Sequence, residues 1–383
     1  MSKRFPLFVL FIVTIKETLC RILSLDFNCT LDLFYIKFSL GVPLQEISLS
    51  VNTAMPFTHV GDKYFIKEKS HKGKLIETVD KVIGTKTYNN VIHFEDNLII
   101  DQMIVGDDFH FYIFDSPKQP WSYGFGLAYQ YENENFSFID LLYKKKRIEK
   151  RVFALVPLGK VFFGGIPKEY NKQYKYNTKC KANDNYVPWG CQINRLYVNN
   201  AEYNLQTYGI MSSTQMYMII SYYFYNIMTS TVYNNTSCHS IEDPFDHMKH
   251  LFCTDKNIIA NTHAYVSFEF DNNSKVKIKS DLLFNCKYKD GCESLFASND
   301  KNHSLFQFGG KFLRLFNRTT FDYDNKEMTF SSYSIEIENG MLINNNRNRI
   351  VGYCIIITII STSTIFCLLV SRIKNNYFFK NVK

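Results

Sequence analysis

The stretch that decides the fold reads Phe34-Tyr-Ile-Lys-Phe-Ser-Leu-Gly-Val-Pro-Leu-Gln-Glu-Ile-Ser-Leu-Ser-Val51. Apolar and polar residues alternate on both sides of Gly41-Val-Pro43, as they do in strands that have one buried face. Two alternating runs joined by Gly and Pro predict a β-hairpin. The second run leads directly into Asn52-Thr53-Ala54-Met55, so these four residues follow a predicted strand.

Similar strand-like runs recur along the chain. Several lie within 91–114, and another pair surrounds the turn Asp271-Asn-Asn-Ser274. Phe138 to Tyr143 is the best helix candidate of the first half, whereas 217–228 fits a helix or a strand. Aromatic residues make up 16% of the chain, which favours strands. The pattern predicts a mainly β protein in two related halves that join near 171–191.

Length and charge narrow the class of protein. The 383 residues suit two lobes of roughly 150 residues each. The formal net charge is +8, but apart from the basic residues between Lys144 and Arg151 the positive charge is scattered. The outer face of a helix explains that basic run better than contact with a membrane surface does. Without a nucleic-acid-binding motif, we expect no nucleic-acid partner.

Two apolar segments predict passage through the secretory pathway. Met1-Ser-Lys-Arg followed by an apolar run to Ile15 is typical of a signal peptide, which we place at 1–20. An uncleaved anchor is the alternative. Residues 350–370 are uncharged and long enough to span a bilayer as a transmembrane helix. A lipid-anchor signal would end in apolar residues, whereas this chain ends in Lys383.

This topology predicts a type I single-pass protein at the cell surface or in a secretory-pathway membrane. Its ectodomain would be lumenal or extracellular, with a juxtamembrane linker at 336–349 and a cytoplasmic tail at 371–383. Such a compartment makes disulfides the default state of cysteine. Glycosylation sequons are compatible with it, and they occur at Asn28, Asn135, Asn234, Asn235, Asn272, Asn302 and Asn317.

The cysteines have two chemical interpretations. Seven lie in the predicted ectodomain, namely Cys29, Cys180, Cys191, Cys238, Cys253, Cys286 and Cys292. A zinc cluster could use Cys238 and Cys253 with the histidines between them. Disulfide cysteines with surface histidines fit an oxidising compartment better, so we expect no metal site. The odd number leaves one thiol free or paired between chains.

Ordered landmarks give the chain a resemblance to the pepsin-like aspartic protease family. The opening hairpin resembles the one that leads into that family's first Asp-Thr-Gly. Gly126-Leu-Ala-Tyr129 and Phe162-Phe-Gly-Gly-Ile166 resemble two further motifs. Gly209-Ile-Met-Ser-Ser-Thr214 falls where the second Asp-Thr-Gly belongs, and Phe308-Gly-Gly-Lys-Phe-Leu-Arg314 resembles a late motif of the C-terminal lobe. The resemblance covers roughly residues 32 to 334.

The resemblance implies a bilobal fold with lobes at 30–170 and 171–335. It places Asn52 and Ser212 at the two catalytic positions, so the dyad is degenerate. It also implies ligand contacts from Thr53, Ser213 and the flap residue Ile83. A disulfide between Cys253 and Cys286 would match the one usual in the family's C-terminal lobe.

Chemistry at those positions predicts an inactive protein. Aspartic proteases need two close carboxyl groups that share one proton, one acting as general base and the other as general acid. An amide and a hydroxyl supply neither role. We therefore expect a pseudoprotease without cofactor or metal, which binds a peptide or protein in the cleft between its lobes. The alternatives are an active but divergent endopeptidase and a structural surface protein or adhesin.

Overall fold

The computed structural model describes the chain between residues 22 and 338, apart from short gaps. The described ranges are 22–30, 33–83, 86–100, 103–115, 124–129, 137–157, 159–171, 174–182, 189–231, 237–243, 247–256, 264–288, 290–298 and 306–338. The predicted signal peptide, membrane span and tail therefore lie outside the described residues. Among the helices that the structure does describe, none has the length and apolar character that crossing a bilayer requires.

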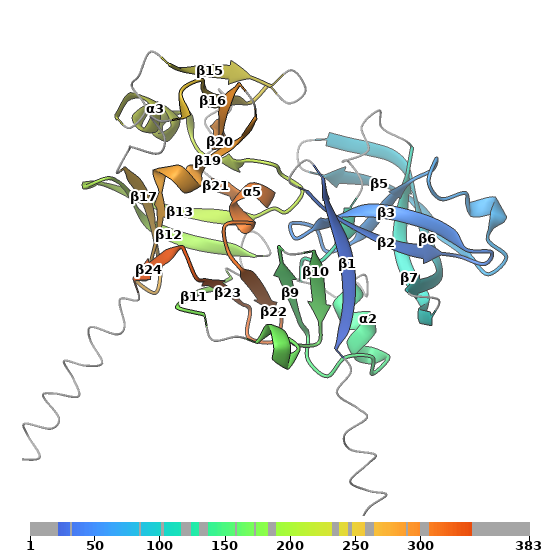
Figure 1. Ribbon diagram of the computed structural model, residues 1–383. Helices are drawn as coiled ribbons and strands as arrows, with labels where there is room; N and C mark the ends of the chain where they lie inside the picture. The colour runs from blue at the N-terminus through green and yellow to red at the C-terminus, as the bar shows by residue number, and fades with distance from the viewer. Residues whose placement is uncertain are drawn as a thin grey trace, which may run out of the picture.

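The first lobe is a strongly curved sheet with a helix packed against it (Figure 1). Its strands are β2 (Leu33–Leu40), β3 (Gln45–Asn52), β4 (Thr58–Gly61), β5 (Lys74–Ile83), β6 (Lys86–Ile100), β7 (Met103–Phe114) and β8 (Gly124–Gly126). The helical elements are the 3-10 turn η1 (Lys67–Lys69) and α2 (Phe138–Lys144). The predicted opening hairpin is confirmed, because β2 and β3 pair antiparallel from Tyr35 opposite Ser50 to Leu40 opposite Gln45.

Two residues explain how local elements of this lobe form, one in the turn of the opening hairpin and one at the start of α2. Gly41 turns the opening hairpin with a φ of +78°, a conformation that favours glycine. The side chain of Ser137 caps α2 by accepting a hydrogen bond from the backbone N–H of Asp140 at 3.4 Å. Phe138, Ile139 and Leu142 form the buried face of that helix. The predicted helix is therefore confirmed, and its apolar face closes one side of the curved sheet.

The second lobe repeats the β-rich construction. Its strands are β12 (Gly190–Val198), β13 (Ala201–Met211), β14 (Met218–Ile219), β15 (Cys238–Glu242), β16 (Lys249–Cys253), β17 (Tyr265–Phe270), β18 (Lys275–Lys279), β19 (Phe284–Tyr288), β20 (Gly291–Ser298), β21 (Phe306–Phe308) and β24 (Glu336–Glu338). The helical elements are α3 (Tyr222–Thr231), η4 (Ser280–Leu283) and α5 (Gly310–Leu313). The hairpin predicted around Asp271 is confirmed as β17 and β18. The stretch 217–228 divides between β14 and α3.

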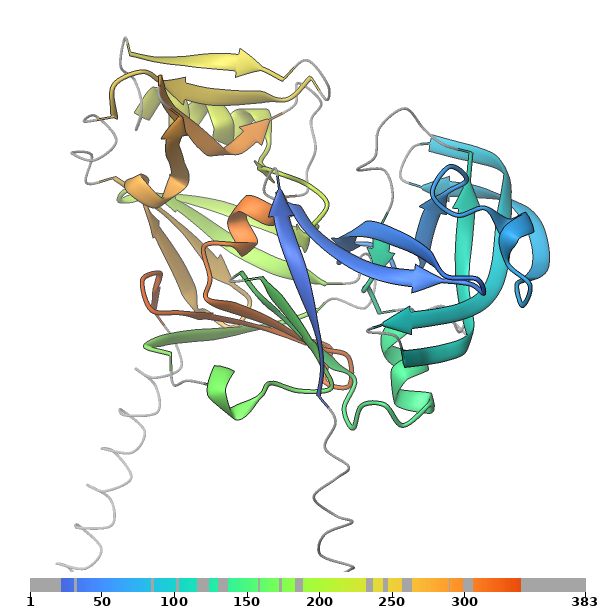
Figure 2. The same cartoon turned by 45° about the vertical axis from the view of Figure 1, so that its right-hand side comes forward.

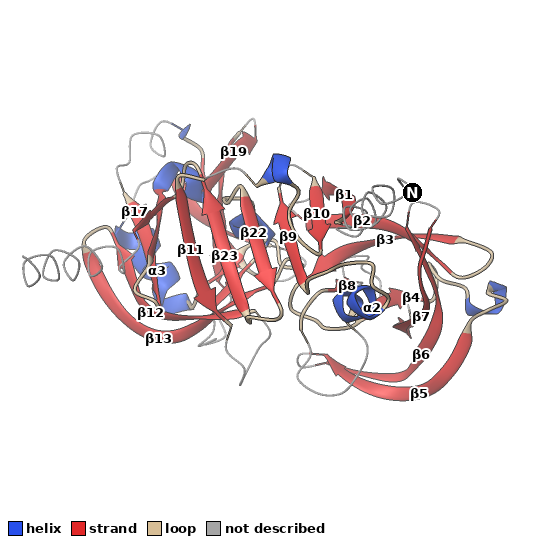
Figure 3. Ribbon diagram, turned by 90° about the horizontal axis from the view of Figure 1, so that it is seen from below, coloured by secondary structure: helices blue, strands red, loops and turns tan. Residues whose placement is uncertain are grey.

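A shared sheet joins the lobes from below (Figure 3). It contains β1 (Leu23–Thr30), β9 (Val152–Val156), β10 (Lys160–Phe163), β11 (Tyr176–Lys181), β22 (Arg318–Asp322) and β23 (Glu327–Ser332), and the 3-10 turn η3 (Lys168–Tyr170) follows β10. The order β11-β23-β22-β9-β10-β1 brings the start, middle and end of the described chain side by side. Figure 2 shows β1 running between the lobes. The mainly β prediction is confirmed, although strand β1 was not predicted from the sequence.

An aromatic cluster packs against the shared sheet. Trp189 is fully buried and contacts Tyr129 of the first lobe, with ring centroids 4.9 Å apart. Phe153 of β9 stacks on Phe321 of β22 at 4.4 Å. The indole N–H of Trp189 and the hydroxyl of Tyr323 both donate to the backbone carbonyl of Leu127, at 2.9 and 2.8 Å. These contacts fix the segment that follows β8, directly beside the end of β3.

Candidate functional site

The first predicted site residue lies where β3 ends. Asn52 is the last residue of β3, which pairs in parallel with β8 so that Asn52 faces Gly126. The backbone N–H of Leu127 donates to the carbonyl of Asn52 at 2.8 Å. The side-chain Oδ1 of Asn52 accepts a hydrogen bond from the backbone N–H of Ala54 at 3.0 Å. Asn52 is therefore held at the head of a tight turn and is only 6% exposed.

The second predicted site residue has a matching position in the other lobe. Ser212 follows β13, which pairs in parallel with β21 so that Met211 faces Phe308. Its backbone N–H donates to the carbonyl of Phe308 at 3.0 Å, and its hydroxyl lies 3.4 Å from that of Thr214. Ser212 is also 6% exposed. In both lobes the residue at the head of the turn thus lies at the end of a central strand that pairs in parallel with a later, shorter strand.

Four reciprocal hydrogen bonds connect the two turns. The hydroxyl of Thr53 donates to the carbonyl of Met211 at 2.7 Å and accepts from the backbone N–H of Ser213 at 3.0 Å. The hydroxyl of Ser213 donates to the carbonyl of Val51 at 2.5 Å and accepts from the backbone N–H of Thr53 at 3.1 Å. Each lobe therefore supplies one hydroxyl and one backbone N–H to the other, with a near-twofold symmetry.

This connection brings the two motifs of the sequence together. Thr53 and Ser213 are fully buried, with 0% exposure, and their hydroxyl groups are engaged between the lobes. The structure therefore gives both residues a structural role. Asn52 and Ser212 directly precede them and present an amide and a hydroxyl at equivalent places of the two turns. That Thr53 and Ser213 also contact a ligand stays a prediction.

The third predicted ligand residue, Ile83, is located less fully. It is the last residue of β5, opposite Lys86 of β6, so it lies at the end of the β5–β6 hairpin. Its side chain and the two hairpin residues that follow it lie outside the described part of the chain. Its predicted contact with a ligand stays a prediction.

Comparison with solved structures bears on the fold. The chain is similar to the crystal structure of an aspartic proteinase from Irpex lacteus, with a TM-score of 0.63 and 13% sequence identity. The similarity covers 82% of this chain and 98% of that one. The fold is that of a pepsin-like aspartic proteinase. At this identity the likeness concerns the pepsin-like fold alone, and searches of family models and of curated proteins found no match.

The pepsin-like fold carries a different set of disulfides from the one expected. Its three disulfides are Cys180–Cys191, Cys238–Cys253 and Cys286–Cys292. The prediction of Cys253–Cys286 is wrong, because the register of β15 and β16 places Cys238 directly opposite Cys253. Cys286 instead pairs within the β19–β20 hairpin. The Cys238–Cys253 disulfide also removes both thiolates from the alternative zinc cluster.

The sequence reasoning missed a buried polar cluster next to the second motif of the pepsin-like fold. Lys311 of α5 donates to Glu293 Oε2 at 2.9 Å, and Tyr217 donates to Glu293 Oε1. The ring of His250 stacks on Tyr217 with centroids 5.2 Å apart. The backbone N–H of Lys311 donates to the carbonyl of Met216, four residues after Ser212. One feature of the sequence could have indicated this cluster, because Glu293 places a carboxylate inside strand β20, which is buried along its whole length.

Electrostatics explain how Glu293 stays charged inside this cluster. Burial alone would raise the pKa of its carboxyl group. The charge of Lys311 and the hydrogen bonds from Tyr217 and Lys311 outweigh burial, so the pKa of Glu293 lies below its usual value. Lys311 is 3% exposed. The cluster is therefore a buried ion pair that ties α5 to β20 close to the turn that holds Ser212.

A separate cavity lies on the second lobe. It has a volume of about 550 Å³ and lies between α3 and the hairpin formed by β15 and β16. Tyr225 and Ser240 are among its lining residues, and their hydroxyl groups are 2.9 Å apart. None of the lining residues belongs to either of the two motifs. The cavity is thus distinct from the candidate site at Asn52 and Ser212.

Proposed function

We propose that this chain is a membrane-anchored pseudoprotease, which has kept the pepsin-like frame and uses it to bind a peptide or protein between its lobes. The observation that carries the proposal is the contrast within the two turns. Thr53 and Ser213 form the complete reciprocal connection between the lobes. Asn52 and Ser212 stand beside them where proton-sharing acids would be needed.

The chemical reason is the proton inventory of these side chains. Two close carboxyl groups cannot both ionise, and this coupling yields a general base and a general acid at one pH. The amide of Asn52 takes up no proton at useful pH. The hydroxyl of Ser212 has neither the charge nor the acidity of a carboxyl group. Each missing general acid or base role removes a rate factor of about 10²–10⁴.

The first test compares cleavage by the natural chain and by a variant with restored acids. The full-length protein is incubated with mixed peptides at acid pH, with and without an aspartic protease inhibitor. We expect no inhibitor-sensitive cleavage. The double variant Asn52→Asp with Ser212→Asp shows whether the frame can still support the reaction, and Asn204→Asp, an exposed substitution of the same kind, is the control. Inhibitor-sensitive cleavage by the natural chain would establish the divergent endopeptidase instead.

The second test concerns binding. A peptide library is screened against the full-length protein, and bound peptides are crosslinked to locate their site. Ligands that crosslink to both lobes near Asn52 and Ser212 would support the proposal. A screen that yields no ligand would favour the alternative of a structural surface protein or adhesin.

The proposed topology is tested separately. Extraction at alkaline pH should leave the full-length chain in the membrane, because residues 350–370 are proposed to span it. Protease added to intact cells or sealed vesicles cuts only the part of the chain that is exposed on its own side of the membrane. The ectodomain is proposed to be lumenal or extracellular and the 371–383 tail cytoplasmic. Release of the chain by alkaline extraction would contradict the anchor.

A further inference from the structure

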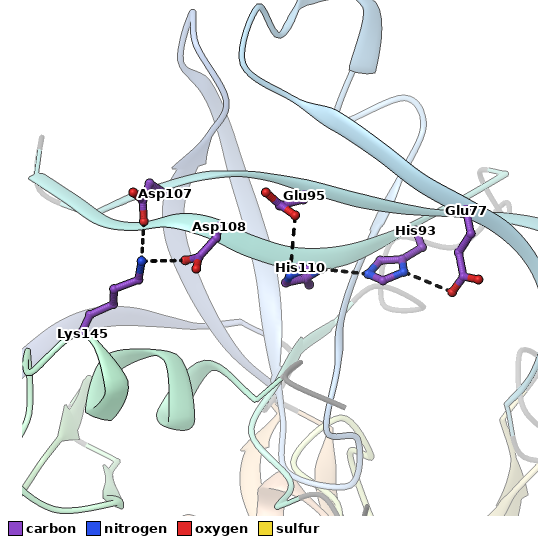
Figure 4. A network of polar contacts seen from close by, with 7 residues as sticks. All are labelled: Glu77, His93, Glu95, Asp107, Asp108, His110 and Lys145. Carbon is purple, nitrogen blue, oxygen red and sulfur yellow. Dashed lines mark hydrogen bonds and ion pairs between the residues drawn. The ribbon is translucent and has the colours of Figure 1, made fainter. Parts of the chain in front are cut away.

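Four side chains form a continuous row across neighbouring strands of the first lobe (Figure 4). Glu77 Oε1 lies 3.3 Å from Nδ1 of His93. Nε2 of His93 lies 3.0 Å from Nδ1 of His110. Nε2 of His110 lies 3.8 Å from Glu95 Oε2. Each imidazole is thus placed between a carboxylate and the other imidazole.

Strand register creates this row. His93 of β6 is opposite Glu77 of β5 on one side and opposite Tyr112 of β7 on the other. Glu95, two residues further along β6, is opposite His110. Because residues two apart point to the same face of a strand, all of these side chains lie on one face of the sheet. The side chain of His93 is 6% exposed, whereas that of His110 is 25% exposed.

Counting hydrogens defines the state of the row when both rings are neutral. A neutral imidazole has one N–H and one bare nitrogen. The contact of His93 with Glu77 is the shorter of the two carboxylate contacts, at 3.3 Å against 3.8 Å for His110 with Glu95, so we assign the N–H of His93 to Nδ1 and let its Nε2 accept. His110 then donates from Nδ1, and its bare Nε2 faces the carboxylate of Glu95. One further proton fits on that nitrogen and completes an ion pair.

The row has no place for a second additional proton. It would have to occupy Nε2 of His93, which already accepts the N–H of His110 across 3.0 Å. Two N–H groups would then point at each other, and two charged rings would face one another with centroids 5.2 Å apart. Like charges in contact raise the energy of the doubly charged state.

We propose that this row is a proton-binding site, which accepts one proton while intact and is forced open between His93 and His110 by a second, so that β7 loosens from β6 in acid. The site needs no ligand other than the proton. Its effect is local, because the two rings that would repel each other belong to the neighbouring strands β6 and β7, while the contact of His93 with Glu77 of β5 becomes an ion pair.

The surrounding charges are consistent with this site. Burial lowers the pKa of His93, and the positive charges of His110 and Lys81 lower it further, while the hydrogen bond to Glu77 acts in the opposite direction. Lys81 of β5 lies over the ring of Tyr112, 4.5 Å from its centroid. Farther along β7, Asp107 and Asp108 are paired with Lys145, as Figure 4 also shows.

The sign of the pH effect follows from linkage. The closed row binds the last proton less readily than a free imidazole, whose pKa is about 6.5. The open form therefore gains protons relative to the closed form as the pH falls below that value. With one proton linked to opening, the ratio of open to closed molecules rises by up to about tenfold per pH unit.

Hydrogen exchange measured by mass spectrometry tests the proposal on the full-length protein in detergent micelles. Exchange of the segment 103–114, which is β7, is followed between pH 7 and pH 5 and corrected for the intrinsic chemical rate. The hairpin at 265–279, which contains no histidine, is the internal reference. We expect opening of 103–114 to increase by up to about tenfold per pH unit below pH 6.5, while the reference segment does not change.

Variants separate the row from general acid sensitivity. His93→Phe removes the buried imidazole and should make opening of 103–114 independent of pH. His110→Gln keeps a polar partner that can donate or accept, and should give a shallower dependence, which settles the question if the first variant does not fold. His247→Gln is the matched control, because His247 pairs with Glu242 at 3.0 Å but is exposed on the other lobe.

Three results would overturn the proposal. The first is a flat profile for 103–114 in the natural chain. The second is an unchanged acid response in both His93→Phe and His110→Gln. The third is equal opening of the reference hairpin, since that would show a global loss of stability.

Discussion

Thr53 and Ser213 each donate a hydroxyl hydrogen into the strand that precedes the other, Thr53 to the carbonyl of Met211 and Ser213 to that of Val51. The residues are 160 positions apart in the chain and come from different lobes. Because both side chains are fully buried, removal of either hydroxyl leaves polar groups without a partner. The first prediction follows from this relationship.

Ser213→Ala should destabilise the protein by about 2–4 kcal/mol. It removes a donor to Val51 and an acceptor for the N–H of Thr53, and each buried polar group left without a partner is unfavourable by about 1–3 kcal/mol. Urea unfolding of the full-length protein measures the change. Ser213→Thr keeps the hydroxyl and should be much milder, and Ser230→Ala, at an exposed helix position, is the control. A loss no larger than that of the control would contradict the structural role.

Lys311→Met should destabilise the protein by about 3–5 kcal/mol, because it leaves the charge of Glu293 buried without its cation. The control is Lys37→Met, which breaks an exposed pair with Glu46 and should change stability too little to measure. If the two variants unfold at the same urea concentration, the buried pair is not structural.

The same ion pair predicts an acid dependence of stability. The folded-state pKa of Glu293 is lowered, so its stabilising contribution is present above the ordinary carboxyl value of about 4.3 and is lost as the pH falls through the folded-state pKa. The natural chain should lose stability more steeply below that value than Lys311→Met does. Parallel curves of unfolding free energy against pH for the two proteins would argue against this origin.

Peptide mapping without reduction should find Cys238 linked to Cys253 and Cys286 linked to Cys292. Trypsin can cut after Lys249 between the first two cysteines and after Lys287 between the second two, so each bond joins two separate peptides. A peptide pair that joins Cys253 to Cys286 would restore the prediction made from the family resemblance and would contradict the register of β15 against β16.

Some of the site could be derived from the sequence. Alternation around Gly41 predicted the hairpin of β2 and β3, and this hairpin delivers Asn52 to the end of a central strand. The motif order placed Ser212 in an equivalent position of the second lobe. These inferences succeed because hairpins and turns depend on residues that are close in the chain.

Contacts between residues far apart in the chain were harder to predict from the sequence. The correct partner of Cys253 follows from the strand register, and a shift by one residue turns every side chain to the opposite face. The cluster of Lys311, Glu293 and Tyr217 assembles residues from three separate segments. The row of His93 and His110 likewise exists only because β6 and β7 pair in one particular register.

The sequence by itself determined the β-rich character, the motif order and the chemical identity of Asn52 and Ser212, because all three are properties of local patterns and side-chain types. Only the tertiary structure decided that Thr53 and Ser213 meet, which cysteines pair, and which charged groups are buried together. The physical reason is that hydrogen bonds, disulfides and ion pairs between distant segments depend on distances of a few ångströms, which the sheet topology sets.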